Sequence, residues 1–109
     1  MTEYRYHATL YSSLLGIKRR GLVPSKGMYE RGVYFAQSIK ETGGYGIRRE
    51  VFLRVLKKDL ERYDYGEWKD DEGWTEEVVP PEVIEVKVDG DWKRLEEIKI
   101  KKLTDGLVF

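Results

Sequence analysis

The stretch that decides the fold is GVYFAQSIKETGGY, residues 32–45. It begins with a short apolar run, Gly32 to Ala36, bounded by glycine on one side and by the polar pair Gln37-Ser38 on the other, which is typical of a buried strand. Ser38 can cap a short helix from Ile39 to about Tyr45, although two internal glycines weaken it. The strand and the helix each deliver one tyrosine, Tyr34 and Tyr45, either to a flat aromatic slot or to the core.

Four further stretches have the composition of strands, and they are Tyr4–Leu10, Val51–Leu56, Trp74–Val79 and Val83–Val88. The second is almost continuously apolar, so we expect it near the centre of the sheet. Pro80-Pro81 must end the third or place it at an edge. Asp89-Gly90 is a strong two-residue hairpin signal and predicts that the chain returns through Trp92.

Helices are expected to be few and short. Ser12-Ser13 offers an N-cap for a helix over residues 14–20, which carries cations in its last turn and ends at Gly21. The charged stretch 57–73 reads as a loop with room for one helical turn at Lys58–Arg62. The tail, Leu95–Phe109, fits a strand or a helix equally well. Short strands with two short helices predict an α+β fold in a single domain, residues 1–109.

The composition excludes several classes of function. Twenty basic residues balance twenty acidic ones, so no global field attracts nucleic acid or a membrane, although a local basic patch remains open. The chain has no Cys and a single His, so thiol chemistry is excluded and only carboxylates remain to build a metal site, which we therefore do not expect. Charged residues make up 37% of the chain, which weakly favours a thermophilic source. We expect a soluble, cytoplasmic protein, because no apolar run spans a membrane and MTEYRYHATL lacks a signal-peptide pattern.

A few side chains are candidates for chemistry. Period-two geometry places His7 and Thr9 on one face of the first strand, just before the serine-capped helix, although a lone His on a strand is often structural. Lys26 and Arg31 fall in a stretch that we expect to be a loop, and they fit either an anionic ligand or solvent. Neither a GxxxxGK nor a GxGxxG motif is present, so a nucleotide would be held in another way.

The stretch 32–46, GVYFAQSIKETGGYG, resembles the nicotinamide-binding segment of poly(ADP-ribose) polymerases and related ADP-ribosyltransferases. In that family a G-(I/V)-YFA strand leads through a Lys-Ser-x-x-Tyr helix to a second tyrosine. Tyr34 and Tyr45 have the separation found in the family, and Lys40 and Thr42 fall at its Lys and Ser positions. Upstream, His7-Ala8-Thr9 resembles the family's His-Gly-(Ser/Thr) strand.

Two weaker matches extend the resemblance over roughly residues 4–88. The segment IKRRGL, residues 17–22, resembles the end of the helix between the two motifs, and VFLRVL, residues 51–56, matches the strand that follows. The resemblance implies a minimal-length member of the His-Tyr-Glu class, with a small, split antiparallel β-sheet core and two short helices.

The resemblance also implies an NAD site. His7 would bond the adenosine ribose, the Ala8 backbone would hold the nicotinamide amide, and the Thr42 hydroxyl would assist it. Tyr45 would stack on the nicotinamide ring, with Tyr34 on its other side. An aromatic slot suits a flat cationic ring, and paired backbone groups recognise a carboxamide. The other residues expected at this NAD site are Thr9, Phe35 and Ala36.

The family's third element is a Glu on a late strand, which helps an oxocarbenium-like transition state to form as nicotinamide leaves. The candidates are Glu76 and Glu77, a few positions before Pro80-Pro81. Strand alternation puts them on opposite faces, and spacing from the turn slightly favours Glu76. With this carboxylate, His7 and Tyr45 complete the predicted catalytic set.

We therefore expect a mono-ADP-ribosyltransferase that cleaves the nicotinamide–ribose bond of NAD and passes ADP-ribose to a protein, a nucleic acid or a small molecule. The sequence departs from the family pattern in two ways. Ala8 replaces the usual Gly, which adds a Cβ near the ligand but keeps the backbone groups. The chain is also much shorter than most transferase domains, so the resemblance indicates NAD binding more strongly than a particular target.

Two alternatives stay open. An RNA 2′-phosphotransferase also uses NAD and has a Pro-Pro turn, but Arg5, Arg19, Arg20 and Arg31 match no defined motif of it. The second alternative is a non-catalytic protein. It would bind NAD or ADP-ribose, or be a small viral or mobile-element interaction protein of the host cytoplasm.

Overall fold

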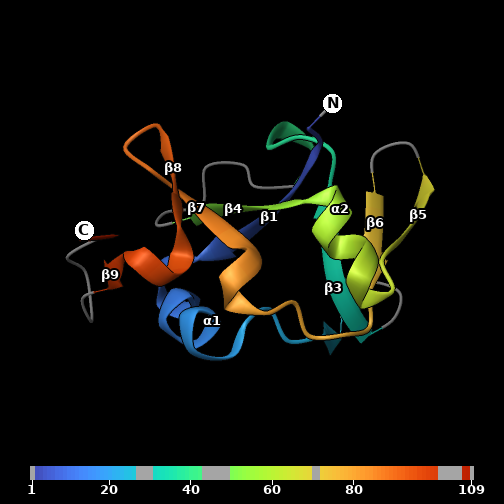
Figure 1. Ribbon diagram of the computed structural model, residues 1–109, viewed down its shortest axis with the longest axis horizontal. Coiled ribbons are helices and arrows are strands. Elements are labelled where there is room, and N and C mark those ends of the chain that lie inside the picture. Colours follow the sequence, from blue (N-terminus) through green and yellow to red (C-terminus); the bar gives the residue numbers. More distant parts are fainter. Residues whose placement is uncertain (1, 27–30, 43–49, 70–71, 101–106, 109) are drawn as a thin grey trace.

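A computed structural model describes residues 2–26, 31–42, 50–69, 72–100 and 107–108. Its main feature is an antiparallel sheet in the order β5-β6-β3-β1-β4-β7-β8, with β2 paired to β3, and it is drawn in Figure 1. The strands of this sheet are β1 (Tyr4–Leu10), β2 (Ser25–Lys26), β3 (Arg31–Ala36), β4 (Glu50–Leu56), β5 (Gly66–Lys69), β6 (Glu72–Thr75), β7 (Ile84–Val88) and β8 (Asp91–Arg94). A separate pair joins β9 (Lys99–Ile100) to β10 (Leu107–Val108).

The helical elements are short and connect the strands. They comprise the α-helices α1 (Leu14–Arg20) and α2 (Lys57–Leu60) and the 3₁₀ turns η1 (Tyr11–Ser13), η2 (Lys40–Thr42), η3 (Glu61–Tyr63), η4 (Pro81–Val83) and η5 (Leu95–Glu97). The antiparallel sheet with two short α-helices confirms the predicted α+β class.

One face of the sheet forms the hydrophobic core. Alternate residues of β4 and β7, among them Leu53 and Val86, are fully buried, as the strand period requires. Leu14 of α1 and Leu60 of α2 are fully buried in the same cluster. Burial of such side chains, at about 1.5–3 kcal/mol each, is what fixes the two helices on this face.

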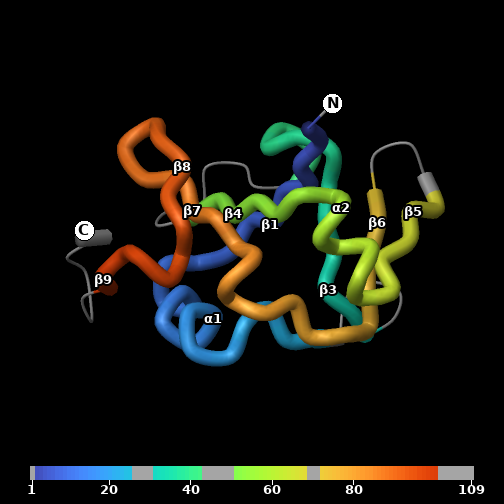
Figure 2. The backbone as a smooth tube through the Cα atoms, in the orientation of Figure 1, coloured from blue at the N-terminus to red at the C-terminus, as the bar shows by residue number. Residues whose placement is uncertain are grey.

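The end of α1 is tied to a distant part of the chain. Gly21 has φ 84°, and its N–H donates to Ile17 O at 2.7 Å, which ends the helix as predicted. The next residue, Leu22, exchanges two backbone hydrogen bonds with Val79, at 2.8 and 3.0 Å. Figure 2 shows the tube that leads into η4 passing beside α1. This contact holds the helix against the segment that precedes β7.

Most predicted strands are confirmed, some with small shifts of their ends. β1 has the predicted bounds, β4 begins one residue before the predicted Val51, and β7 begins one residue after the predicted Val83. The Asp89-Gly90 turn joins β7 to β8 with φ values of 50° and 85°, as its sequence predicts. The tail adopts strand rather than helix in β9, after the η5 turn.

Two predictions between residues 57 and 79 are wrong. In the stretch 57–73, α2 and η3 confirm the helical turn predicted at Lys58–Arg62, but β5 and the start of β6 lie where a loop was predicted. The strand predicted over Trp74–Val79 is instead β6, which ends at Thr75, and Val79 makes only an isolated bridge. The second α-helix is therefore α2. The helix predicted over residues 39–45 is the 3₁₀ turn η2 as far as Thr42, and its remainder lies outside the described residues.

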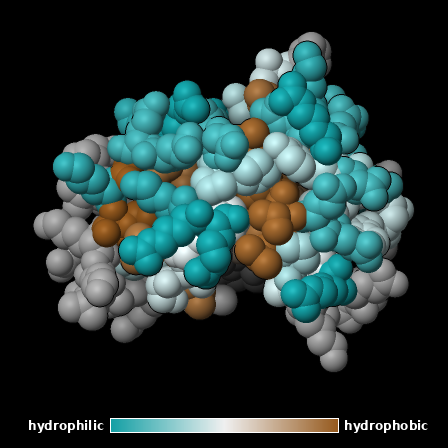
Figure 3. All heavy atoms as spheres, turned by 60° about the horizontal axis from the view of Figure 1, so that its bottom comes forward, coloured by the Kyte–Doolittle hydropathy of each residue, from teal (hydrophilic) through white to brown (hydrophobic). Residues whose placement is uncertain are grey.

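The face of the molecule shown in Figure 3 is mostly hydrophilic, with apolar atoms visible in small separate areas. Large hydrophobic side chains that are exposed anywhere on the described residues are Leu10, Val23, Trp68 and Val78. None of the described helices is long and apolar enough to cross a membrane.

Candidate functional site

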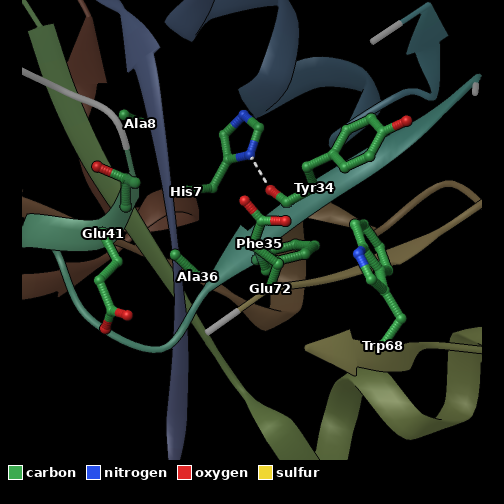
Figure 4. A pocket seen from close by; sticks show the side chains of 9 residues that line it. His7, Ala8, Tyr34, Phe35, Ala36, Glu41, Trp68 and Glu72 are labelled. Atoms are coloured by element: carbon green, nitrogen blue, oxygen red, sulfur yellow. Dashed lines mark hydrogen bonds between the residues drawn. The ribbon is translucent and has the colours of Figure 1, made fainter. Parts of the chain in front are cut away.

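The candidate site lies where the sheet splits. β1 pairs with β4 along its whole length, whereas its described register with β3 consists of the single pair Tyr6↔Ala36. Past this pair β1 and β3 diverge, and a pocket of about 340 Å³ opens beside them. We call it pocket A, lined by His7, Ala8, Tyr34, Phe35, Ala36, Glu41, Thr42, Trp68 and Glu72 (Figure 4).

The side chain of His7 bridges the split. Its Nδ1 lies 2.7 Å from the backbone carbonyl oxygen of Tyr34. A carbonyl can only accept, so Nδ1 carries the proton and Nε2 of the neutral ring is the hydrogen-bond acceptor. Burial lowers the pKa of His7, and the hydrogen bond to Tyr34 opposes that effect less strongly. The imidazole is therefore neutral at pH 7.

Aromatic rings form one wall of pocket A. The ring of Tyr34 is perpendicular to that of Trp68, at 87° and 6.2 Å between centroids, and stacks on Trp74 at 26° and 6.3 Å. The two indoles also meet edge to face. Contacts of this kind hold Tyr34 in place. Gly32 makes room for the wall, because a Cβ there would lie 2.8 Å from Trp74 Cε3.

Two carboxylates also line pocket A. Glu72 lies on β6, directly opposite Ala36 of β3, and in Figure 4 its side chain points from β6 towards the part of the pocket where His7 meets Tyr34. Glu41 lies on η2, where its N–H donates to Ser38 Oγ at 3.3 Å and its carboxylate accepts from the same hydroxyl at 2.7 Å. Ser38 therefore caps this turn, as its sequence predicts, and its hydroxyl also holds the Glu41 carboxylate.

The predicted Glu76 and Glu77 are not among the residues that line pocket A. Both are exposed and follow the end of β6, where the Glu77 N–H donates to Thr75 Oγ1 at 3.0 Å. Their supposed placement on opposite strand faces is wrong, because the strand has already ended. Glu72, four positions before Glu76, is the late-strand carboxylate that lies with His7 and Tyr34.

Sequence reasoning missed Glu72 because it took residues 57–73 for a loop, and it missed Trp68 for the same reason. A signal was present: two tryptophans, Trp68 and Trp74, flank the short acidic pair Asp70-Asp71. Trp favours strands, so the segment has the composition of a hairpin.

Six of the predicted NAD-site residues line pocket A together, and they are His7, Ala8, Tyr34, Phe35, Ala36 and Thr42. The Thr42 hydroxyl donates to the carbonyl oxygen of Ile39 at 2.7 Å, so towards a ligand its oxygen acts as an acceptor. Phe35 is buried, and its ring lies 5.7 Å from the imidazole of His7. Tyr45, predicted to stack on nicotinamide, lies outside the described residues.

A second cavity, cleft B, continues from pocket A and has a volume of about 550 Å³. His7 and Tyr34 line both cavities, while Thr9 belongs to cleft B. Helix α1 contributes Arg19 and Arg20, both in its last turn, and the other hydroxyl-bearing residues of cleft B are Ser12, Ser13 and Ser25. Cleft B thus joins a neutral imidazole to a cationic rim.

Arg5 serves the structure rather than either cavity. It is only 6% exposed and its guanidinium pairs with Glu67, which also accepts from the Tyr65 hydroxyl at 2.7 Å. Arg31 begins β3 and is exposed. Within the described ranges, no group of three or more His, Asp or Glu side chains gathers in a way that could hold a metal ion.

Comparison of the chain with models of known protein families and with curated proteins found no match.

Proposed function

We propose that this chain binds NAD and acts as an ADP-ribosyltransferase, cleaving the nicotinamide–ribose bond and passing ADP-ribose to an acceptor. The observation that carries the proposal is that His7, Tyr34 and Thr42, from three separate elements, line one pocket together with the carboxylate of Glu72. The volume of pocket A is within the range of small-molecule sites, about 300–1,000 Å³.

Each lining group has a chemical role in this proposal. Nε2 of His7 accepts a hydrogen bond from a ribose hydroxyl, since Nδ1 is committed to Tyr34. The Ala8 backbone and the Thr42 oxygen bind the carboxamide of nicotinamide. The aromatic wall at Tyr34 receives the cationic pyridinium ring, which π-faces attract.

The carboxylate of Glu72 supplies the catalytic charge. As the nicotinamide–ribose bond breaks, its electron pair moves to the ring nitrogen and positive charge develops on the ribose. A fixed carboxylate next to that charge stabilises the transition state more than the ground state. We assign this role to Glu72 because it lines pocket A, whereas the exposed Glu76 and Glu77 do not.

The test uses NAD labelled in its adenine half. Nicotinamide release and label transfer are measured with the full chain and with His7→Ala. Release by the wild type that is lost in the variant is the expected result. Tight NAD binding without release, whatever the acceptor, would leave only a non-catalytic binder of NAD or ADP-ribose. Absence of binding would remove both proposals.

One observation favours the phosphotransferase as a second candidate. Arg19 and Arg20 line cleft B beside His7, and guanidinium groups bind phosphate well. An RNA with an internal 2′-phosphate, incubated with NAD, tests it. Loss of the 2′-phosphate with formation of an ADP-ribose phosphate would favour this candidate over transfer to a protein.

A further inference from the structure

The imidazole of His7 is held at two points. Its Nδ1 donates to the Tyr34 carbonyl oxygen (Figure 4), and its ring lies 5.7 Å from the ring of Phe35, at an interplanar angle of 55°. A histidine side chain rotates about two bonds, and one hydrogen bond alone does not fix both of them. The direction in which Nε2 points therefore depends also on the contact with Phe35, which is buried.

The ring of Phe35 is held in turn by Tyr65. The two rings meet edge to face, at 86° and 5.8 Å between centroids, a geometry that aromatic pairs favour. Tyr65 lies in the short connection between η3 and β5, so its position depends on its side chain rather than on a strand ladder. Gly73, the register partner of Phe35 on β6, leaves room for the phenol ring, because a Cβ there would lie 2.2 Å from the Tyr65 hydroxyl oxygen.

The hydroxyl of Tyr65 is anchored by an ion pair. It donates to the Glu67 carboxylate at 2.7 Å, and the Arg5 guanidinium donates to the same carboxylate. Burial and the hydrogen bond to Glu67 raise the pKa of Tyr65, so the hydroxyl keeps its proton and remains a donor. Arg5 lies on β1, two residues before His7. The chain of contacts therefore leaves β1 at Arg5 and returns to the same strand at His7.

We infer that Tyr65 is a positioning residue for His7: anchored by Glu67, it holds the ring of Phe35, and Phe35 sets the direction of Nε2. Tyr65 and Glu67 are not among the residues that line pocket A, so they act through Phe35 rather than on a ligand. The value of this positioning for NAD binding rests on the proposed function, in which Nε2 accepts from a ribose hydroxyl. An acceptor that is already oriented binds without a further cost of ordering.

The first experiment needs no ligand. His7 is the only histidine of the chain, so its ¹⁵N resonances report its tautomer in each variant. Tyr65→Leu removes the ring and its anchor, and it is expected to shift both nitrogen resonances towards the average of two exchanging tautomers. Tyr65→Phe keeps the ring and should lie between Tyr65→Leu and the wild type. Unchanged His7 resonances in Tyr65→Leu would overturn the inference.

A control variant separates positioning from a general loss of stability. Val88→Ala shortens a buried side chain on β7 that does not line pocket A. It should lower the free energy of unfolding and leave the His7 resonances unchanged, whereas equal shifts in Val88→Ala and Tyr65→Leu would overturn the inference. If Tyr65→Leu does not fold, Tyr65→Phe decides, and the absence of any shift there would overturn the inference.

NAD binding then separates this inference from the proposed function. In the wild-type background Tyr65→Leu should raise the Kd for NAD about threefold to tenfold, the range expected for the loss of one hydrogen bond. In the His7→Ala background the same change should have no further effect, because no imidazole remains to be positioned.

The outcomes are distinguishable. Equal effects of Tyr65→Leu on NAD binding in both backgrounds would end the inference, while release of nicotinamide by the wild type would keep the proposed function. Shifted His7 resonances in Tyr65→Leu, together with a wild type that does not bind NAD, would keep the positioning role of Tyr65 and end the proposed function.

Discussion

The imidazole of His7 donates from Nδ1 to the carbonyl oxygen of Tyr34, 2.7 Å away, and so connects β1 to β3 where their ladder has stopped. One side chain thereby stands in for a missing backbone hydrogen bond. The same contact fixes the tautomer that presents Nε2 as an acceptor. This one hydrogen bond therefore links the backbone of Tyr34 to the chemistry of His7.

The first prediction concerns the protonation of His7. Its pKa in the folded chain lies below the ordinary value of 6.5, chiefly because of burial. The unfolded chain therefore binds the proton more readily, and the free energy of unfolding falls as the pH drops below 6.5 towards the folded pKa. Because His7 is the only histidine, its ¹⁵N resonances give both its pKa and its tautomer directly.

Urea denaturation at a series of pH values measures the same effect as stability. In His7→Gln, which keeps a donor for Tyr34 O, the decline between pH 7 and 5 should flatten. A folded pKa at or above 6.5, or a proton on Nε2 at neutral pH, would contradict the tautomer that we derive.

The second prediction concerns the carboxylate of pocket A. Glu72→Gln should reduce nicotinamide release from NAD by about 10²–10³-fold, because the charge acts mainly in the transition state. The Kd for NAD should change little. Glu76→Gln and Glu77→Gln are the matched controls, and both should retain activity. A silent Glu72→Gln beside an inactive Glu76→Gln would return the catalytic role to the residue that the sequence favours.

The third prediction concerns the buried guanidinium of Arg5. Glu67→Gln removes its main partner and should lower the free energy of unfolding by about 3–5 kcal/mol. Tyr65→Phe, which removes one hydrogen bond to Glu67, should cost about 1–2 kcal/mol. Glu96→Gln breaks an exposed pair with Arg94 and should cost less than about 1 kcal/mol. Denaturant titration orders the three, and equal losses would refute a structural role for Arg5.

The Arg5–Glu67 pair also predicts a pH dependence. The hydrogen bond from Arg5 is the first cause that lowers the pKa of Glu67 below its ordinary 4.5. This stabilisation is present above pH 4.5 and is lost as the pH falls through the folded pKa. It is therefore separate from the His7 effect, which begins at higher pH. Wild type and Glu67→Gln should converge in stability as the solution is acidified.

The fourth prediction concerns Gly21 at the end of α1. Its φ of 84° disfavours any side chain, and a Cβ would lie 2.2 Å from Val79 O. Gly21→Ala should therefore cost about 2–3 kcal/mol of unfolding free energy. Gly66→Ala is the matched control, because nothing lies within 4 Å of a Cβ there. Equal stabilities of the two variants would show that the backbone at Leu22 and Val79 moves to accommodate the new Cβ at little cost in free energy.

The sequence was informative where local chemistry alone sets the structure. The Tyr- and Thr-rich composition of Tyr4–Leu10 predicts β1, and the apolar run Val51–Leu56 predicts β4, because buried strands need apolar residues. Gly21 ends α1 and Asp89-Gly90 turns the chain since both positions have positive φ. His7, Tyr34 and Thr42 come together through two motifs whose spacing the sequence displays.

The sequence was misleading where partners distant in the chain decide the structure. β5 and β6 are four-residue strands, too short for a periodic pattern, and they exist because β6 pairs with β3. Glu72 enters pocket A through that pairing, opposite Ala36. The register between two strands 36 residues apart in sequence cannot be read from either alone, so Glu76 and Glu77 were the residues that spacing favoured.

Because β1 and β3 diverge, a ligand of pocket A lies beside two strands that are no longer paired with each other. Past the pair Tyr6↔Ala36, β1 and β3 share no further register pair among the described residues, and the His7 side chain hydrogen-bonds across the gap to the Tyr34 carbonyl oxygen. A carboxamide that binds there acts as a surrogate peptide group and bridges the two halves of the sheet. Ligand binding in pocket A and the association of β1 with β3 then stabilise each other, so a bound ligand should slow amide hydrogen exchange in both strands. While it is bound, the substrate would hold β1 and β3 together.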